Sequence, residues 1–285
     1  MQDRKAVWPW AVAGVLVLGG AGWWLFRDEL RTAMPAAPPR AVATAAGGER
    51  SVPPETPETP QTPAAAAGAS AAPARYPLPR DAAIDAALPS LEDSDARVRE
   101  DLAALFPAPV LALLPPDHRL QRLVTHIDNL DQARVPASAL ALRPLPGDLQ
   151  VEGDAASGIT VAGANAARYA PYVAAFTAVD ADALAAAYMR LYPLVQQAYR
   201  ELGHPGGQFN DRVVAVIDHL LLTPEPARPP LLERDARGRY RFVDPQLQAR
   251  SIGQKALLRL EADQARVVKH QLRAIRRALT RGGPG

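Results

Sequence analysis

The chain has 285 residues, of which 48% are hydrophobic, 22% are charged and 29 are proline, and its formal net charge is +2. It contains no cysteine, which excludes disulfides, iron–sulfur clusters, cysteine-ligated zinc and thiol nucleophiles. The small net charge excludes a uniformly basic nucleic-acid coat and an acidic tail protein, but it leaves room for a local charged patch.

The first element is an apolar segment, 7–26, which follows a short N-terminal tail, 1–6, and contains no charged side chain. A helix of this length crosses the hydrocarbon core of a bilayer at about 1.5 Å per residue. Tryptophans lie in pairs near both ends, as is typical of the headgroup level. We therefore predict a single-pass anchor in a bacterial inner membrane, rather than a cleaved signal peptide. The short tail favours a periplasmic C-terminal domain, although the flanking basic residues do not decide the orientation.

A linker, 27–75, follows the predicted anchor. Its stretch 33–75 holds 15 alanines and 9 prolines and no aromatic residue. Such a composition buries too little apolar area to offset the loss of chain entropy, so we predict that the linker is disordered. It would reach roughly 35–40 Å as a coil and about 130 Å if fully extended.

Residues 76–285 are predicted to form a mainly α-helical domain with one or two small β-hairpins, and this length suffices to bury a core. Helix caps, prolines and apolar periodicity set the expected elements. These are a helix from Ser94 to Phe106, a helix opened by Pro116 and Asp117, a hairpin within 149–161, a turn capped by Asn165 before a helix starting at Pro171, a helix from the cap Asp180 to Gly203, a helix capped by Asn210, a hairpin within 231–243, a helix over 246–260 after Asp244-Pro245, and a last helix over 263–279.

This domain contains a set of short motifs, which are Ser94-Asp95-Ala96, Val98-Arg99-Glu100, Asp128-Asn129-Leu130, Tyr169-Ala170-Pro171-Tyr172, Leu191-Tyr192-Pro193-Leu194, Gln197-Ala198-Tyr199, Phe209-Asn210-Asp211-Arg212, Ile217-Asp218-His219-Leu220, Asp244-Pro245 and Gly253-Gln254-Lys255. As a set they resemble the bacterial family called domain of unknown function 3014, over most of residues 76–279. The resemblance implies membrane association, assigns no activity and supplies no catalytic residue.

Two pairs of histidine and aspartate are the candidate metal ligands: His126 with Asp128, and Asp218 with His219. Two helices brought together would place imidazoles and carboxylates in one cleft, a donor set suited to zinc or manganese. The spacing matches no compact metal motif. The alternative is that these side chains are buried hydrogen-bonding groups or helix-end ion pairs.

A second candidate site is the segment Phe209-Asn210-Asp211-Arg212, which follows two glycines and opens a helix. Free N–H groups at a helix start attract carboxylates and phosphates. Helix capping by Asn210 and Asp211 explains the same residues without a ligand. Tyr169, Tyr172 and Phe209 are in addition candidates to line a binding groove.

Charge is unevenly divided along the domain. Residues 76–227 carry 11 basic and 19 acidic side chains, whereas 228–285 carry 14 basic and 5 acidic ones. Three explanations stay open: the basic end packs on the acidic body, it meets anionic envelope material, or it binds nucleic acid, which the absence of interleaved aromatics disfavours. The candidate contact residues are Arg266, Lys269, Arg273, Arg276 and Arg277.

From these patterns we favour a membrane-anchored, non-enzymatic interaction or scaffold domain in the periplasm. Its expected partners are the bilayer, through residues 7–26, and an envelope protein or anionic envelope polymer. No cofactor is predicted. The alternative is an envelope hydrolase or metal-dependent enzyme that uses the histidine and aspartate cluster. The oligomeric state is not determined by the sequence.

Overall fold

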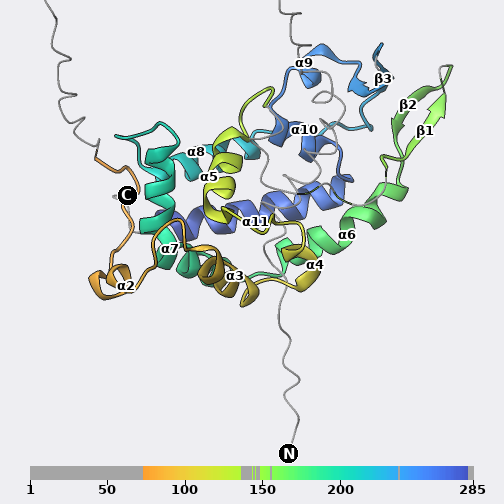
Figure 1. Cartoon of the computed structure of the whole chain (residues 1–285). Helices are drawn as coiled ribbons and strands as arrows, with labels where there is room; N and C mark the ends of the chain where they lie inside the picture. The colour runs from red at the N-terminus through yellow and green to blue at the C-terminus, as the bar shows by residue number, and fades with distance from the viewer. Residues whose placement is uncertain are drawn as a thin grey trace, which may run out of the picture.

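A computed structural model describes the helical domain (Figure 1), and the described residues are 73–135, 143, 145, 148–154, 156–236 and 238–281. The predicted anchor, 7–26, lies outside them, as does the linker up to residue 72. Within the described residues, no helix is long and apolar enough to cross a bilayer.

The described domain is mainly helical, as predicted, and it has a small antiparallel sheet to one side of the helices (Figure 1). The helices are α2 (Ala82–Ala86), α3 (Asp95–Ala103), α4 (Ala108–Leu111), α5 (Arg119–Asn129), α6 (Ala164–Thr177), α7 (Ala181–Glu201), α8 (Phe209–Leu221), α9 (Pro245–Gln248), α10 (Ile252–Leu258) and α11 (Ala262–Thr280). The strands are β1 (Val151–Asp154), β2 (Gly158–Val161), β3 (Leu232–Arg234) and β4 (Tyr240–Phe242).

Helix α11 runs through the centre of the domain, where it packs against α6, α7 and α8 (Figure 1). Its apolar residues Val268, Leu272, Ile275 and Leu279 are all buried in the largest core cluster. These residues recur every three or four positions, so they share one face of the helix. The opposite face of α11 is thereby left to solvent.

The two predicted hairpins are confirmed, and they also join each other. Strand β1 pairs with β2, and β3 pairs with β4, all antiparallel. The pairing of Ile159 with Leu232 links the hairpins into one sheet of order β1-β2-β3-β4. Leu232 and Phe242 pack with Leu149 and Leu258 in a separate small core.

The prediction that a new helix starts at Pro171 is wrong, because α6 is one helix that contains Pro171. Asn165 does not cap a turn; it lies inside α6, where its side chain bonds to both the N–H and the carbonyl of Gln150. Proline removes one helical hydrogen bond. The burial of Tyr169 and Phe176 on either side of Pro171 offsets that loss.

Helix starts were predicted with mixed success. Asp180 and Asp244 are confirmed as caps whose carboxylates accept from backbone N–H groups. Ser94 precedes α3, but its hydroxyl donates to the carbonyl of Leu91 instead of capping the helix. The helix expected over 246–260 is divided into α9 and α10, since Ser251 provides a second cap by accepting from Gln254 N.

Candidate functional site

The four candidate metal ligands have separate environments in the structure. His126 is fully buried, and neither of its ring nitrogens has a hydrogen-bond partner. Asp218 pairs with Arg276 on α11, and His219 Nε2 lies 2.9 Å from Ser251 Oγ. Asp128 is held by Arg212. Throughout the described residues, no group of three or more histidines and acids is placed to hold a metal ion.

Arg212 is the centre of the most extensive charged cluster near these residues. From α8 it reaches the end of α5, with Nε 2.6 Å from Asp128 Oδ1 and Nη1 2.6 Å from Asp131 Oδ2. The hydrogen bonds that Arg212 donates to Asp131 raise the pKa of the Arg212 guanidinium. Burial raises the pKa of Asp131, but the hydrogen bonds and charge of Arg212, together with the hydrogen bond from Gln132 and the charge of His219, outweigh it and leave that pKa below its usual value. This cluster clamps α5 to α8.

The contact between His219 and Ser251 resembles half of a hydrolase triad, so the oxyanion donors around it matter. The N–H groups at the start of α10 have other partners: Ile252 N donates to Gln132 O, and Gly253 N donates to Leu130 O. The next one, from Gln254, bonds to Ser251 Oγ itself. These three donors are therefore committed to holding α10 in place and do not face a substrate. Ser251 serves as a helix cap.

The start of α8 is likewise occupied by the protein's own groups. Phe209 N donates to Gln196 Oε1 at 2.8 Å, and Asn210 N contacts the Tyr192 hydroxyl at 3.4 Å. The Asp211 carboxylate accepts from the backbone N–H groups of residues 75 and 76, both at 2.8 Å. The segment thus fixes the point at which the linker meets the domain.

The residues proposed to line a groove are part of the core. Tyr169 and Phe209 are 2% and 1% exposed and belong to different apolar clusters. Tyr172 packs against the cluster of Tyr169. The structure does not bring the three side chains together on an open surface.

Two of the five predicted contact residues of α11 are used inside the domain. Lys269 is buried, and its Nζ donates to Thr223 O at 2.6 Å and pairs with Glu225 at 2.7 Å. Arg276 forms a two-bond pair with Asp218, at 2.5 and 3.0 Å. To this extent the basic end of the chain packs on its acidic body, which is one of the three explanations left open by the sequence.

The remaining basic residues of α11 lie together on its exposed face. They are spaced by three or four positions, so they form one row along the helix. We call this row the basic face; its members, all exposed, are Arg266, His270, Arg273, Arg277 and Arg281. Arg266 and Arg281 pair with Asp263 and Asp182 at positions where both partners are largely exposed.

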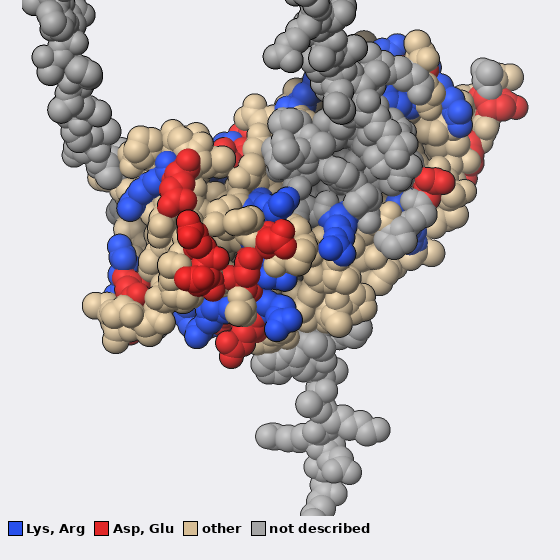
Figure 2. Space-filling view, in the orientation of Figure 1, with Lys and Arg blue, Asp and Glu red and all other residues tan. Residues whose placement is uncertain are grey.

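Arg266, Arg273 and Arg277 of this row were predicted from the sequence, in which Arg281 follows them, whereas His270 was not among the predicted contact residues. Their spacing of three or four positions along the helix is the sequence feature that indicates a shared row. Elsewhere acids and bases are mixed: Figure 2 shows them interspersed over the face that carries α3, α5 and α7. There Asp101, for example, pairs with both Arg97 and Arg190. The basic face differs in that its basic side chains outnumber the acids beside it, which are Asp263 and Asp182 at its ends and Glu225 near Arg266 and Arg273.

A family model described as a protein of unknown function (DUF3014) matches residues 119–276. The chain belongs to the DUF3014 family. In this DUF3014 member the matched range starts with α5 and extends almost to the end of α11, so it contains the Arg212 clamp and most of the basic face. No curated protein and no solved structure matches the chain.

Proposed function

We propose that the chain is a membrane-anchored, non-enzymatic domain that contacts the anionic headgroups of its own bilayer through the basic face of α11. The basic face is the observation that carries this proposal. Residues 7–26 would supply the anchor in the bacterial inner membrane, and the domain would lie in the periplasm.

Because the linker would hold the domain near the membrane, a weak electrostatic contact would be enough to keep the basic face on the lipid headgroups. The linker ends at residues 75 and 76, which are bonded to Asp211 on the domain. A coil of this length reaches roughly 35–40 Å, so the domain stays next to the membrane at a high effective concentration. Each arginine near an anionic leaflet contributes about 1 kcal/mol.

The shape of the basic face favours a planar anionic surface as the partner. From Arg266 to Arg281 the row extends about 22 Å along a helix that rises 1.5 Å per residue. The apolar side of α11 is buried in the core, so charge and not insertion provides the contact. The exposed row contains no aromatic residue on which nucleic-acid bases would stack.

The test uses the full chain in lipid nanodiscs. Because the chain has no cysteine, Val267→Cys on the exposed side of α11 accepts a single fluorescent donor, and acceptors are placed on lipid headgroups. We expect efficient energy transfer with anionic lipid and low transfer with zwitterionic lipid. About 1 M salt, where the Debye length is about 3 Å, should abolish the difference. Equal transfer with both lipids would contradict the proposal.

The periplasmic placement has a separate test. Alkaline phosphatase fused after Gly285 is active only outside the cytoplasm, so we expect an active fusion. A fusion that is inactive although the protein accumulates would place the domain in the cytoplasm. It would leave the basic face to be tested against the inner leaflet, which is also anionic.

A further inference from the structure

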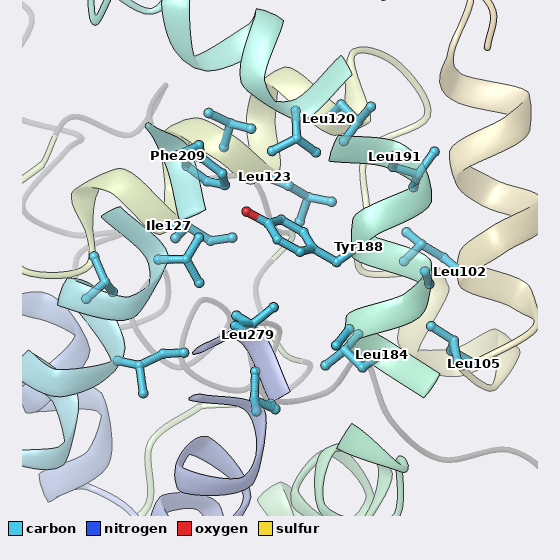
Figure 3. A pocket seen from close by; sticks show the side chains of 18 of the residues that line it. Leu102, Leu105, Leu120, Leu123, Ile127, Leu184, Tyr188, Leu191, Phe209 and Leu279 are labelled. Carbon is cyan, nitrogen blue, oxygen red and sulfur yellow. The ribbon is translucent and has the colours of Figure 1, made fainter. Parts of the chain in front are cut away.

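The interior of the helical body contains an apolar cavity of about 190 Å³ (Figure 3). Its walls come from α3, α5, α6, α7, α8 and α11. Each of the lining side chains is buried or half-buried, so the helical body surrounds much of the cavity. Leucines from most of these helices line it, among them Leu102, Leu120, Leu184 and Leu279.

Among the described residues, two with polar side chains line this cavity, and they differ in whether their polar atoms have partners. The carboxylate of Asp101 is engaged by Arg97 at 2.9 Å and by Arg190 at 3.1 Å. The hydroxyl of Tyr188 is buried and has no hydrogen-bond partner. Burial also raises the pKa of Tyr188 well above its usual value, so the phenol stays neutral.

Tyr188 points directly into the cavity. Its ring extends from α7, and Figure 3 shows its hydroxyl oxygen in the space between Leu123, Ile127 and Phe209. A buried hydroxyl without a partner has a desolvation penalty that native structures rarely tolerate. A trapped water does not remove this penalty, because a buried water needs two to four polar partners and these walls are almost entirely apolar.

We propose that the cavity is a binding site for a small, neutral, apolar molecule with one hydrogen-bonding group, which pairs with the Tyr188 hydroxyl. The volume sets the size, since a cavity of about 150 Å³ accommodates benzene. The ligand is thus slightly larger than benzene. A charged ligand is excluded because its charge would find no free partner among these side chains.

The proposed site depends only on the cavity and Tyr188, so a test of the basic face does not decide it. Two probes of the same shape test it: p-cresol, which carries a hydroxyl, and p-xylene, in which a methyl group replaces that hydroxyl. Each is titrated into the full chain in nanodiscs, and methyl NMR signals of the lining leucines and valines report binding. Nanodiscs without protein give the amount of probe taken up by lipid.

We expect both probes to shift these methyl signals, and we expect the wild-type chain to prefer p-cresol. The Tyr188→Phe variant should reduce the affinity ratio of p-cresol to p-xylene by about tenfold, the loss expected for one hydrogen bond. Lipid uptake of each probe is the same for both chains, so it cancels in this comparison. The methyl spectrum also shows whether the variant is folded.

A second variant, Leu184→Phe, fills part of the cavity from the same helix and leaves Tyr188 in place. It should weaken both probes together without changing their ratio. Absence of methyl shifts with either probe in the folded wild-type chain would overturn the proposal. An affinity ratio that is unchanged in Tyr188→Phe would also overturn it, because the hydroxyl would then have no role in selecting the ligand.

Discussion

His126 is a fully buried histidine whose ring nitrogens have no hydrogen-bond partner. Burial lowers its pKa from 6.5 to about 4. Between these two values the unfolded chain binds a proton that the folded chain does not, so stability falls as the pH is lowered from about 6.5 to about 4. The residue accounts for a loss of about 3 kcal/mol over this window.

The variant His126→Leu should remove that part of the pH dependence. Urea unfolding of the domain, followed by circular dichroism at pH 7 and pH 4.5, measures it. The control is His270→Gln, which changes an exposed histidine on α11 and should leave the wild-type dependence intact. If His126→Leu and the wild type lost the same stability on acidification, the buried neutral imidazole would not be the cause.

Tyr188 and its neighbour Tyr192 make a matched pair on α7, with rings 5.5 Å apart. The Tyr188 hydroxyl is unpartnered, whereas the Tyr192 hydroxyl lies 3.0 Å from Gln196 Oε1. We predict that Tyr188→Phe raises the free energy of unfolding in the absence of ligand by about 1–3 kcal/mol, since an unsatisfied buried hydroxyl is removed.

Tyr192→Phe should change stability in the opposite direction, because it leaves Gln196 with one partner fewer. Denaturant titrations of the two variants side by side provide the measurement. Destabilisation by both substitutions would show that Tyr188 has a structural partner, and it would remove the hydroxyl as a feature available to a ligand.

At the scale of the elements, α5 depends on a cap from another helix. The Asp95 carboxylate, on α3, accepts from the backbone N–H groups of His118 and Arg119, both at 2.8 Å. His118 has a φ of 53°, a left-handed conformation that is uncommon for residues with a side chain. No side chain from α5 itself caps its start.

We therefore predict that Asp95→Ala lowers the free energy of unfolding by about 1–2 kcal/mol, the usual effect of losing a helix cap. Chemical denaturation measures it. Glu92→Ala, an exposed acid in the turn before α3, is the control for the change in charge and should have little effect. An equal loss in both variants would mean that Asp95 acts through charge and not through these two bonds.

Local patterns predicted those elements whose ends are determined locally. Asp180 caps α7 with its own carboxylate, and Gly203 adopts a φ of 115° just beyond its end, so both ends could be recognised from the sequence. Asn165 and Asn210 were misassigned as caps because their amides bond to Gln150 and Tyr76, which are distant in the chain. Residue type alone does not show such partners.

The same distinction between local patterns and distant partners applies to the candidate sites. The helical period of α11 predicted that Arg266, Arg273 and Arg277 would be near one another, whereas the burial of Lys269 depends on Thr223 and Glu225. The cavity could not be predicted, because its volume depends on how far apart several helices lie. Tyr188 lies at helical spacing from Leu184 and Leu191, but this periodicity does not reveal the empty space in front of it.

At the scale of the whole molecule, a predicted anchor and linker precede a domain in which the exposed side of α11 carries the basic face. The linker attaches beside Asp211, at the start of α8, and α8 packs directly on α11. The linker therefore meets the domain at a helix that contacts α11. In the proposed arrangement the basic face would meet the bilayer without a further partner, and we expect this contact to weaken as salt is added.

The most direct measurement compares two charge reversals of equal size, using the fluorescent donor at Val267→Cys and headgroup acceptors in anionic nanodiscs. Arg273→Glu with Arg277→Glu changes the basic face, whereas Arg99→Glu with Arg200→Glu changes exposed positions on α3 and α7. The account predicts that the first pair abolishes energy transfer to the lipid and that the second pair preserves most of it. Equal effects of the two pairs, or none from the first, would contradict the claim that α11 faces the membrane.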